Sequence, residues 1–225
     1  MTETRTVLLT GFEPFGGDST NPSGDVARAL NGETLECTAA GAGEADTTDA
    51  AAHATVIGRV LPVSFAASAA QLEQLAAKHR PDLIIALGLA DGREAITPER
   101  VAINYADARI PDNDGAQPRD EPLDPTGPAA HFTGLPVKRI ARALTDAGHP
   151  ATVSLTAGSY VCNAVAYHLG AIAERRTQQT GTPTPAGFIH VPNWPADRLT
   201  PAIRLAIATT LANPTDLDEA GGSIH

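Results

Sequence analysis

Short runs of apolar residues alternate along this chain with segments in which apolar residues recur every three or four positions. The clearest run, 83–87, is unbroken, which is typical of a strand covered on both faces, and Gly88 opens a loop after it. Further strands are predicted by the apolar patterns at 6–9, 56–63, 101–104, 152–156 and 187–191.

Helical spacing of apolar residues predicts five helices between these strands. The first has Asn21 as its N-cap and Pro22 at the first helical position, a combination that starts helices, and it ends before Gly32. The last is expected at 201–212, with Thr200 as its cap. The remaining three are expected at 68–79, 136–147 and 164–176.

Because strands and helices alternate, the pattern predicts an α/β fold: one three-layer α/β/α domain over 1–225, with a twisted, mainly parallel central sheet flanked by helices. Two segments lack a regular apolar pattern. The stretch 36–54, rich in Ala, Gly and acidic residues, is expected to be a mobile loop, and 213–225 a frayed tail. Residues 110–128, crowded with Pro, Asp and Gly, predict a long surface loop.

Composition narrows the function. The formal net charge is −10, which disfavours binding to nucleic acid through a basic surface. No apolar run is long enough for a membrane span, and the first residues do not form a secretory leader. Two widely separated cysteines favour a reducing cytoplasmic compartment over a disulfide framework, and they fit no metal-ligand spacing. A small-molecule partner is therefore expected.

Cys162 is the candidate nucleophile. It precedes a segment of helical composition, and a helix N-terminus stabilises a thiolate because its unpaired amides carry partial positive charge. The alternative is a small buried apolar residue without chemistry. Cys37 has no helix start behind it and is not expected to act in catalysis.

A cysteine nucleophile needs a base and usually a group that orients it. His190 ends the predicted strand 187–191, at the edge where open α/β sheets gather their sites. His168 lies about 240° around the helix from Cys162 and points away from it. Glu99, in the loop after 83–87, reaches the same edge, although a surface ion pair with Arg100 is the simpler local reading.

The loop 11–17 is rich in glycine but is not a phosphate-binding turn. It has no Gly-x-Gly-x-x-Gly or Gly-Lys-Ser/Thr pattern, and Glu13 stands where such loops keep residues small or basic. Phe12 and Phe15 suggest an apolar wall for a small uncharged group, with plain core packing as the alternative.

Taken together, the segments form an ordered set of motifs. They are LLTGFEPFGG (8–17) with NPS (21–23), ITPERVAIN (96–104), DARIPDN (107–113), GPAA (127–130), TGLP (133–136), VCN (161–163) and FIHVP (188–192). In this order the set resembles the pyroglutamyl peptidase type I family, also called pyrrolidone-carboxylate peptidase, from about Val7 to Pro192.

The resemblance implies a cysteine exopeptidase that removes an N-terminal pyroglutamyl residue through a Cys-His-Glu triad. The triad positions match Cys162, His190 and Glu99. The resemblance further implies that the substrate is bound by Phe12, Phe15, Asn21 and Val161, with Arg109 and the Cys162 amide at the oxyanion. Assembly into a homotetramer is a further expectation from the family.

Leu89 departs from the family pattern, because many members carry a glutamine there. A second reading is therefore the same scaffold with altered acyl specificity. A third is a binding protein that captures cyclic or blocked peptide ends without cutting them, although pure binding needs no activated thiol. Trp194, after the histidine motif, either packs or faces the peptide side of the cleft.

Overall fold

The structure is a computed structural model that describes residues 4–37 and 52–221. Its main sheet has six strands in the order β2-β3-β1-β4-β8-β5. The bounds are β1 (Arg5–Phe12), β2 (Thr34–Cys37), β3 (Ala52–Leu61), β4 (Leu83–Leu89), β5 (Thr97–Pro98) and β8 (Ala186–Val191). The four central strands, β3, β1, β4 and β8, run parallel, and the two edge strands are antiparallel to their neighbours.

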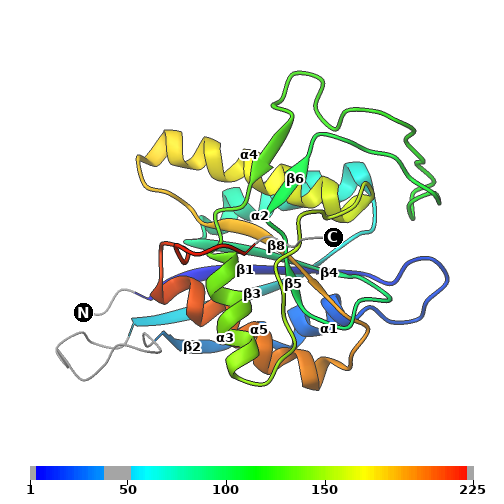
Figure 1. Ribbon diagram of the computed structural model, residues 1–225. Coiled ribbons are helices and arrows are strands. Elements are labelled where there is room, and N and C mark those ends of the chain that lie inside the picture. Colours follow the sequence, from blue (N-terminus) through cyan, green and yellow to red (C-terminus); the bar gives the residue numbers. More distant parts are fainter. Residues whose placement is uncertain (1–3, 38–51, 222–225) are drawn as a thin grey trace.

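Helices cover both faces of this sheet (Figure 1). On one face lie α2 (Phe65–His79) and α4 (Val161–Thr180), and on the other α1 (Pro22–Ala29), α3 (Val137–Asp146) and α5 (Ala196–Ala212). A separate ribbon of β6 (Val101–Ile103) and β7 (Ala130–Phe132) packs on α4. The predicted α/β fold with a mainly parallel sheet between helices is confirmed.

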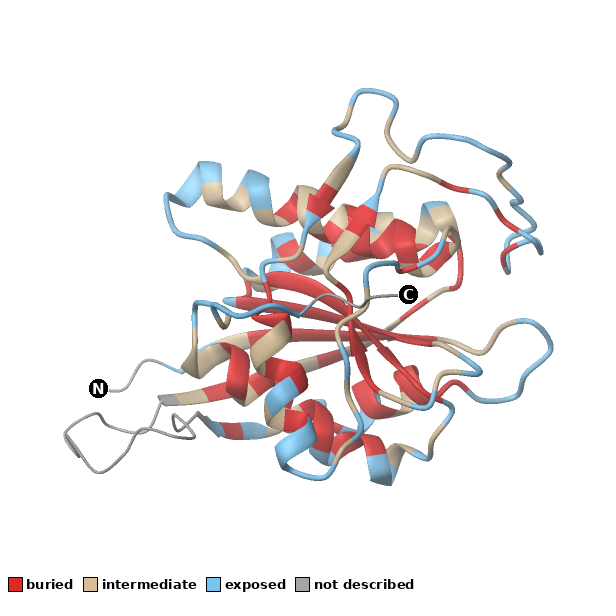
Figure 2. Cartoon of the chain, in the orientation of Figure 1, coloured by how far each residue is buried: buried red, intermediate tan, exposed pale blue. Residues whose placement is uncertain are grey.

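Two apolar cores explain why these residues form strands. Along β1, Val7 and Leu9 belong to the core beneath α1, α3 and α5, whereas Leu8 belongs to the core beneath α2 and α4. Successive strand residues point to opposite faces, so both sides of a central strand must be apolar. All seven residues of β4 are buried, and Figure 2 shows the buried residues concentrated in the sheet and on the helix faces toward it.

Most of the predicted elements are confirmed with shifted ends. Helix α1 begins at Pro22, and the side chain of Asn21 accepts a hydrogen bond from the Ser23 amide as its cap. Strand β4 extends two residues beyond the predicted 83–87, to Leu89.

Three predictions about elements were wrong. Residues 152–156 form no strand: Ser154 makes only an isolated bridge to Glu99, so the alternating pattern marks a segment that lines the sheet edge. Helix α5 begins at Ala196, and Thr200 is inside it rather than at its cap. Part of the expected loop 36–54 is strand, because β2 and β3 pair there, while 38–51 lie outside the described residues.

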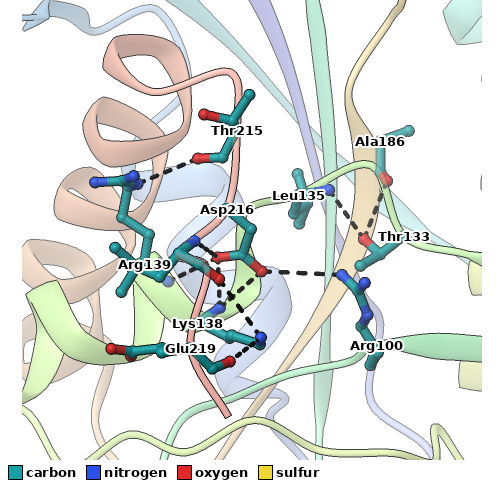
Figure 3. Close-up of polar contacts among 10 residues, drawn as sticks. Arg100, Thr133, Leu135, Lys138, Arg139, Ala186, Thr215, Asp216 and Glu219 are labelled. Carbon is teal, nitrogen blue, oxygen red and sulfur yellow. Dashed lines mark hydrogen bonds and ion pairs between the residues drawn. The ribbon is translucent and has the colours of Figure 1, made fainter. Parts of the chain in front are cut away.

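The tail was also predicted wrongly, because its described part is docked rather than frayed. The carboxylate of Asp216 accepts hydrogen bonds from the amides of Lys138 and Arg139 at the start of α3, which has no cap of its own (Figure 3). Glu219 pairs with Arg142 at 2.7 Å. A distant side chain therefore supplies the cap that local sequence lacks.

Neither a membrane-spanning helix nor a cluster of metal-ligating side chains is found in the part of the chain that the structure describes. None of its helices is both long and apolar enough to cross a bilayer. Among residues 4–37 and 52–221, no three His, Cys, Asp or Glu side chains converge as a metal would need.

Candidate active site

His190 is placed by the register of two central strands. It lies near the carboxyl end of β8, opposite Gly88 of β4. Phe188, two residues earlier, points to the same face, and its ring centroid is 4.9 Å from that of His190. Because Phe188 belongs to the core beneath α2 and α4, His190 faces α4 at the carboxyl edge of the sheet.

Glu99 is brought to His190 by the short strand β5 at the sheet edge. Its amide donates to the carbonyl oxygen of Phe188 at 2.9 Å, which fixes the backbone beside β8. The Glu99 carboxylate Oε1 lies 2.7 Å from His190 Nδ1, with 2% of Glu99 and 5% of His190 exposed. A carboxylate at this distance selects the tautomer in which Nδ1 donates. Nε2 of His190 is then left to act elsewhere.

Cys162 approaches the same edge from α4. It is the second residue of that helix, as its predicted place at a helix N-terminus requires, and the N-cap Tyr160 makes no side-chain cap. A side-chain carbon added to Gly88 would lie 2.9 Å from Cys162 Sγ. Gly88 has no side chain and therefore leaves room for the Cys162 thiol. Because Gly88 is the register partner of His190, Cys162 and His190 share one face of the sheet.

The ionisation of Cys162 differs from the expectation. Burial raises the pKa of the thiol to about 12, and the negative charge of Glu99 adds to the rise. Arg93 and a hydrogen bond from the Cys162 backbone act in the opposite direction. Burial thus opposes the stabilisation that a helix N-terminus offers a thiolate, and a thiol that attacks must give up its proton.

Arg93 is a site residue that sequence reasoning missed. Its guanidinium donates to Glu99 Oε1 at 2.7 Å, to Thr97 Oγ1 at 2.5 Å and to the Thr156 carbonyl oxygen at 3.2 Å. One carboxylate oxygen of Glu99 therefore serves both Arg93 and His190. The positive charge of Arg93 offsets the free-energy cost of burying the Glu99 carboxylate. An isolated Glu at this depth would have no such partner.

The predicted alternative for Glu99, a surface pair with Arg100, is wrong. Arg100 instead lies over the ring of Phe132 and 3.9 Å from the Asp216 carboxylate. Arg93 and Arg100 flank the same strand, β5. Arg100 is nearer to Glu99 in the sequence, but Arg93 is the one that pairs with it. Glu99 bridges to Ser154 at the sheet edge, whereas Arg100 stands at a bend directly after it, and the two side chains meet different partners.

The residues expected to bind an apolar group gather near Cys162. Phe12, 3% exposed, lies with its ring 6.4 Å from that of Phe188, and Phe15 lies 6.2 Å from the ring of Tyr160. Val161 is buried directly before Cys162. These side chains share the core beneath α2 and α4, so packing and an apolar wall are compatible roles.

Asn21 has a structural task in this region. Its Oδ1 accepts from the amide and hydroxyl of Ser23, and its Nδ2 donates to the Glu13 carbonyl oxygen at 2.9 Å. With 2% of the residue exposed, it fixes the loop that carries Phe12 and Phe15. An effect of Asn21 on substrate therefore runs through that loop.

Arg109 is exposed, in a segment held against the start of α4. The Asp107 amide donates to the Ser159 carbonyl oxygen at 3.0 Å, and the Tyr160 hydroxyl donates to the carbonyl oxygen of Pro111. These contacts bring the backbone around Arg109 next to the segment that precedes Cys162. They do not fix the position of its guanidinium.

The remaining singled-out residues fall around the site. Leu89 ends β4, is 8% exposed and pairs with Val191. Trp194 packs on Arg198, whose guanidinium lies 3.5 Å from its ring centroid. His168 is on α4, in contact with the ring of Tyr167.

Comparison with known proteins shows the family to which a chain with these residues belongs. The family model described as pyroglutamyl peptidase matches residues 5–205. The chain belongs to the pyroglutamyl peptidase family. It is therefore a cysteine-type peptidase, in agreement with the resemblance of its motifs.

Individual relatives agree over nearly the full length. The chain is 44% identical to a pyrrolidone-carboxylate peptidase of Chromobacterium violaceum, over 98% of this chain and 100% of the relative. It is 40% identical to that of Bacillus amyloliquefaciens, over 97% and 98%. Among solved structures, pyroglutamyl peptidase I from B. amyloliquefaciens aligns with a TM-score of 0.83 and 38% identity, over 97% of this chain and 100% of that one.

A second solved structure shows the same architecture. The pyrrolidone carboxyl peptidase of Thermococcus litoralis aligns with a TM-score of 0.77 and 38% identity, over 92% of this chain and 94% of that one. The shared fold therefore extends over both helix layers and the sheet between them.

Proposed function

We propose that this peptidase removes the N-terminal pyroglutamyl residue from peptides, with Cys162 as nucleophile, His190 as base and Glu99 as the orienting acid. The observation that carries the proposal is the 2.7 Å hydrogen bond between Glu99 and His190 on the face of the sheet that holds Cys162. Such a carboxylate fixes the imidazole and stabilises its charged form.

The chemistry is acyl transfer in two steps. Cys162 Sγ attacks the pyroglutamyl carbonyl carbon while His190 Nε2 takes the thiol proton, which the raised pKa of the thiol makes necessary. Collapse of the tetrahedral adduct breaks the C–N bond, and Nε2 gives the proton to the leaving amine. A water then gives a proton to Nε2 and attacks the thioester carbonyl carbon. Collapse of this second adduct breaks the C–S bond, releases pyroglutamate, and Nε2 returns the proton to the leaving sulfur.

The oxyanion needs donors near Sγ. The amide of Cys162 lies in the first turn of α4, where helix N–H groups have no partner within the helix. One such donor is worth about 3 kcal/mol of transition-state stabilisation. Arg109 remains the second proposed donor, and its segment is already held beside Ser159.

Specificity follows from the apolar surroundings of the nucleophile. Phe12, Phe15 and Val161 offer no partner for a charged amine, so an ordinary N-terminus must lose its hydration without compensation. The lactam of a pyroglutamyl group is compact and uncharged, so it avoids this cost. Phe12 and Phe188 pack against each other, and Phe188 and the Cys162 thiol both border Gly88.

The wider proposal follows the family. The chain acts as one catalytic domain over 1–225, in the cytoplasm, without a metal or cofactor, and assembles as a homotetramer. Its substrates are pyroglutamyl-blocked peptides.

The test is release of a fluorescent amine from a pyroglutamyl amide under reducing conditions, beside proline and free glutamine amides. We expect turnover of the pyroglutamyl amide alone, and its loss in Cys162→Ala. Turnover of a different amide would show altered acyl specificity and direct attention to Leu89. Tight binding of a pyroglutamyl peptide without cleavage would replace the enzyme by a binding protein.

A further inference from the structure

Behind the proposed triad, two buried polar atoms have no hydrogen-bond partner among the described residues. One is Oε2 of Glu99, whose other oxygen serves His190 and Arg93. The second is Nε2 of His131, a residue of β7 that is 5% exposed. A buried carboxylate oxygen and a buried imidazole nitrogen without partners are costly, so such groups usually meet a water.

Glu99 and His131 line the same small pocket, between the β6–β7 ribbon, α4 and β8. The space open to the centre of a water-sized sphere is about 10 Å³, which suits one water molecule and excludes a larger ligand. The other side chains around it are mostly apolar and include Val101, Ala166 and Phe188.

The pocket is built by close approaches rather than left by loose packing. A side-chain carbon on Gly170 of α4 would lie 2.3 Å from Cβ of His131, so only glycine lets the ribbon approach this near. A side-chain carbon on Gly187 of β8 would lie 2.1 Å from Thr133 Oγ1. Both glycines belong to the pocket lining.

Hydrogen-bond chemistry then determines what occupies the pocket. His131 Nδ1 lies 3.1 Å from Oε1 of Glu174, an exposed carboxylate that can only accept when ionised. Nδ1 therefore carries the proton of the neutral ring, and Nε2 is an acceptor. Glu99 Oε2 is an acceptor as well. Two unpartnered acceptors on residues that line one water-sized space suit a molecule with two donors, and water has two.

We propose that one buried water bridges Glu99 Oε2 and His131 Nε2, and that His131 is a positioning residue for the proposed triad. The water donates one hydrogen to each acceptor. It holds the second oxygen of Glu99, so that the first stays aligned with His190 Nδ1. The positioning role rests on the proposed function, whereas the water site does not.

The first test is a high-resolution crystal structure of the wild-type protein. We expect density for an ordered water within about 3.2 Å of both atoms. A pocket without density there, or a direct contact that replaces the water, overturns the proposal whatever the activity. Absence of peptidase activity in a protein that holds the water would contradict the proposed function and the positioning role, but not the site.

The second test measures kcat and KM on a pyroglutamyl amide. His131→Leu removes the acceptor, and we expect kcat to fall about tenfold with KM nearly unchanged, since outer hydrogen bonds orient the groups that react. His131→Gln places an amide near the position of Nε2 and should restore most of kcat. Failure of Gln to restore kcat, with both variants folded, would reduce His131 to a packing residue.

Two matched variants control this result. His168→Leu makes the same change at a histidine of α4 outside the pocket, and we expect kcat within about twofold of wild type. Glu174→Gln keeps an acceptor for His131 Nδ1 while removing the surface charge, and should have an equally small effect. A tenfold loss in His168→Leu would show that general packing, not the water, sets kcat.

Discussion

Glu99 and Asp216 are two carboxylates whose partners are distant in the sequence, but the groups that they bind differ. The Glu99 side chain is 1% exposed, and one of its oxygens serves both a histidine and an arginine. The Asp216 side chain is 20% exposed and accepts from two backbone amides of α3. Under the proposed function the first orients a group that reacts, whereas the second completes a helix. The same chemical group thus supports the site in one region and stability in the other.

The largest expected effect comes from Glu99→Gln. The amide keeps the shape but presents the wrong charge to the imidazolium, so kcat/KM should fall by about 10³–10⁴. Glu219→Gln, which weakens a tail ion pair with Arg142, is the control and should leave kcat/KM unchanged. Steady-state kinetics with thermal melts of both variants separates lost chemistry from lost folding.

The next prediction concerns the thiol. Burial raises the pKa of Cys162 to about 12, so we expect its thiolate to form only at strongly alkaline pH. Thiolate formation is measured as ultraviolet absorbance during a pH titration, and the part that belongs to Cys162 is the part missing in Cys162→Ala. The folded state holds this proton more tightly than the unfolded chain. The linked stability is therefore complete below the ordinary pKa of 9.0 and decreases as pH rises toward 12. A thiolate signal near neutral pH would instead indicate a resting ion pair with His190.

A smaller loss is expected at Arg93, which donates to the same Glu99 oxygen that lies against His190 Nδ1. Arg93→Gln removes a charged hydrogen bond and should lower kcat/KM about 10- to 100-fold. The matched variant is Arg100→Gln, one residue from Glu99 but directed at Asp216. Equal losses in the two variants would show that the ion pair seen at Glu99 has no special part.

The smallest effect on activity is expected at Asp216. Asp216→Ala removes the cap of α3 and should lower the free energy of unfolding by about 1 kcal/mol, with kcat unchanged. Asp218→Ala, on the same tail, is the control. Chemical denaturation measures the first quantity and the amide assay the second. A large loss of kcat in Asp216→Ala would mean that the two regions are not separate.

How much of the fold could be predicted from the sequence depends on how far apart in the chain the contacting residues lie. Strand β4 was visible because burial on both faces needs an unbroken apolar run. The cap at Asn21 was visible because cap and helix are adjacent. The docking of Asp216 on α3 joins residues 78 positions apart, and nothing local signals it.

The candidate site shows the same division. Cys162 and His190 were found from helix-start and strand-end positions, and the family motifs linked them to Glu99. Arg93 was missed because its partner depends on how a loop returns to the sheet edge. The burial of His131 Nε2 without a partner depends on how closely two chain segments approach at Gly170. Only the folded structure shows that approach.

The most direct test of the central claim is to look for the acyl-enzyme. The protein is quenched with acid during turnover of a pyroglutamyl amide, digested and analysed by mass spectrometry. We predict a pyroglutamyl thioester on the peptide that contains Cys162, and its absence from Cys162→Ala. An acyl group on another residue, or turnover that persists in Cys162→Ala, would contradict the account.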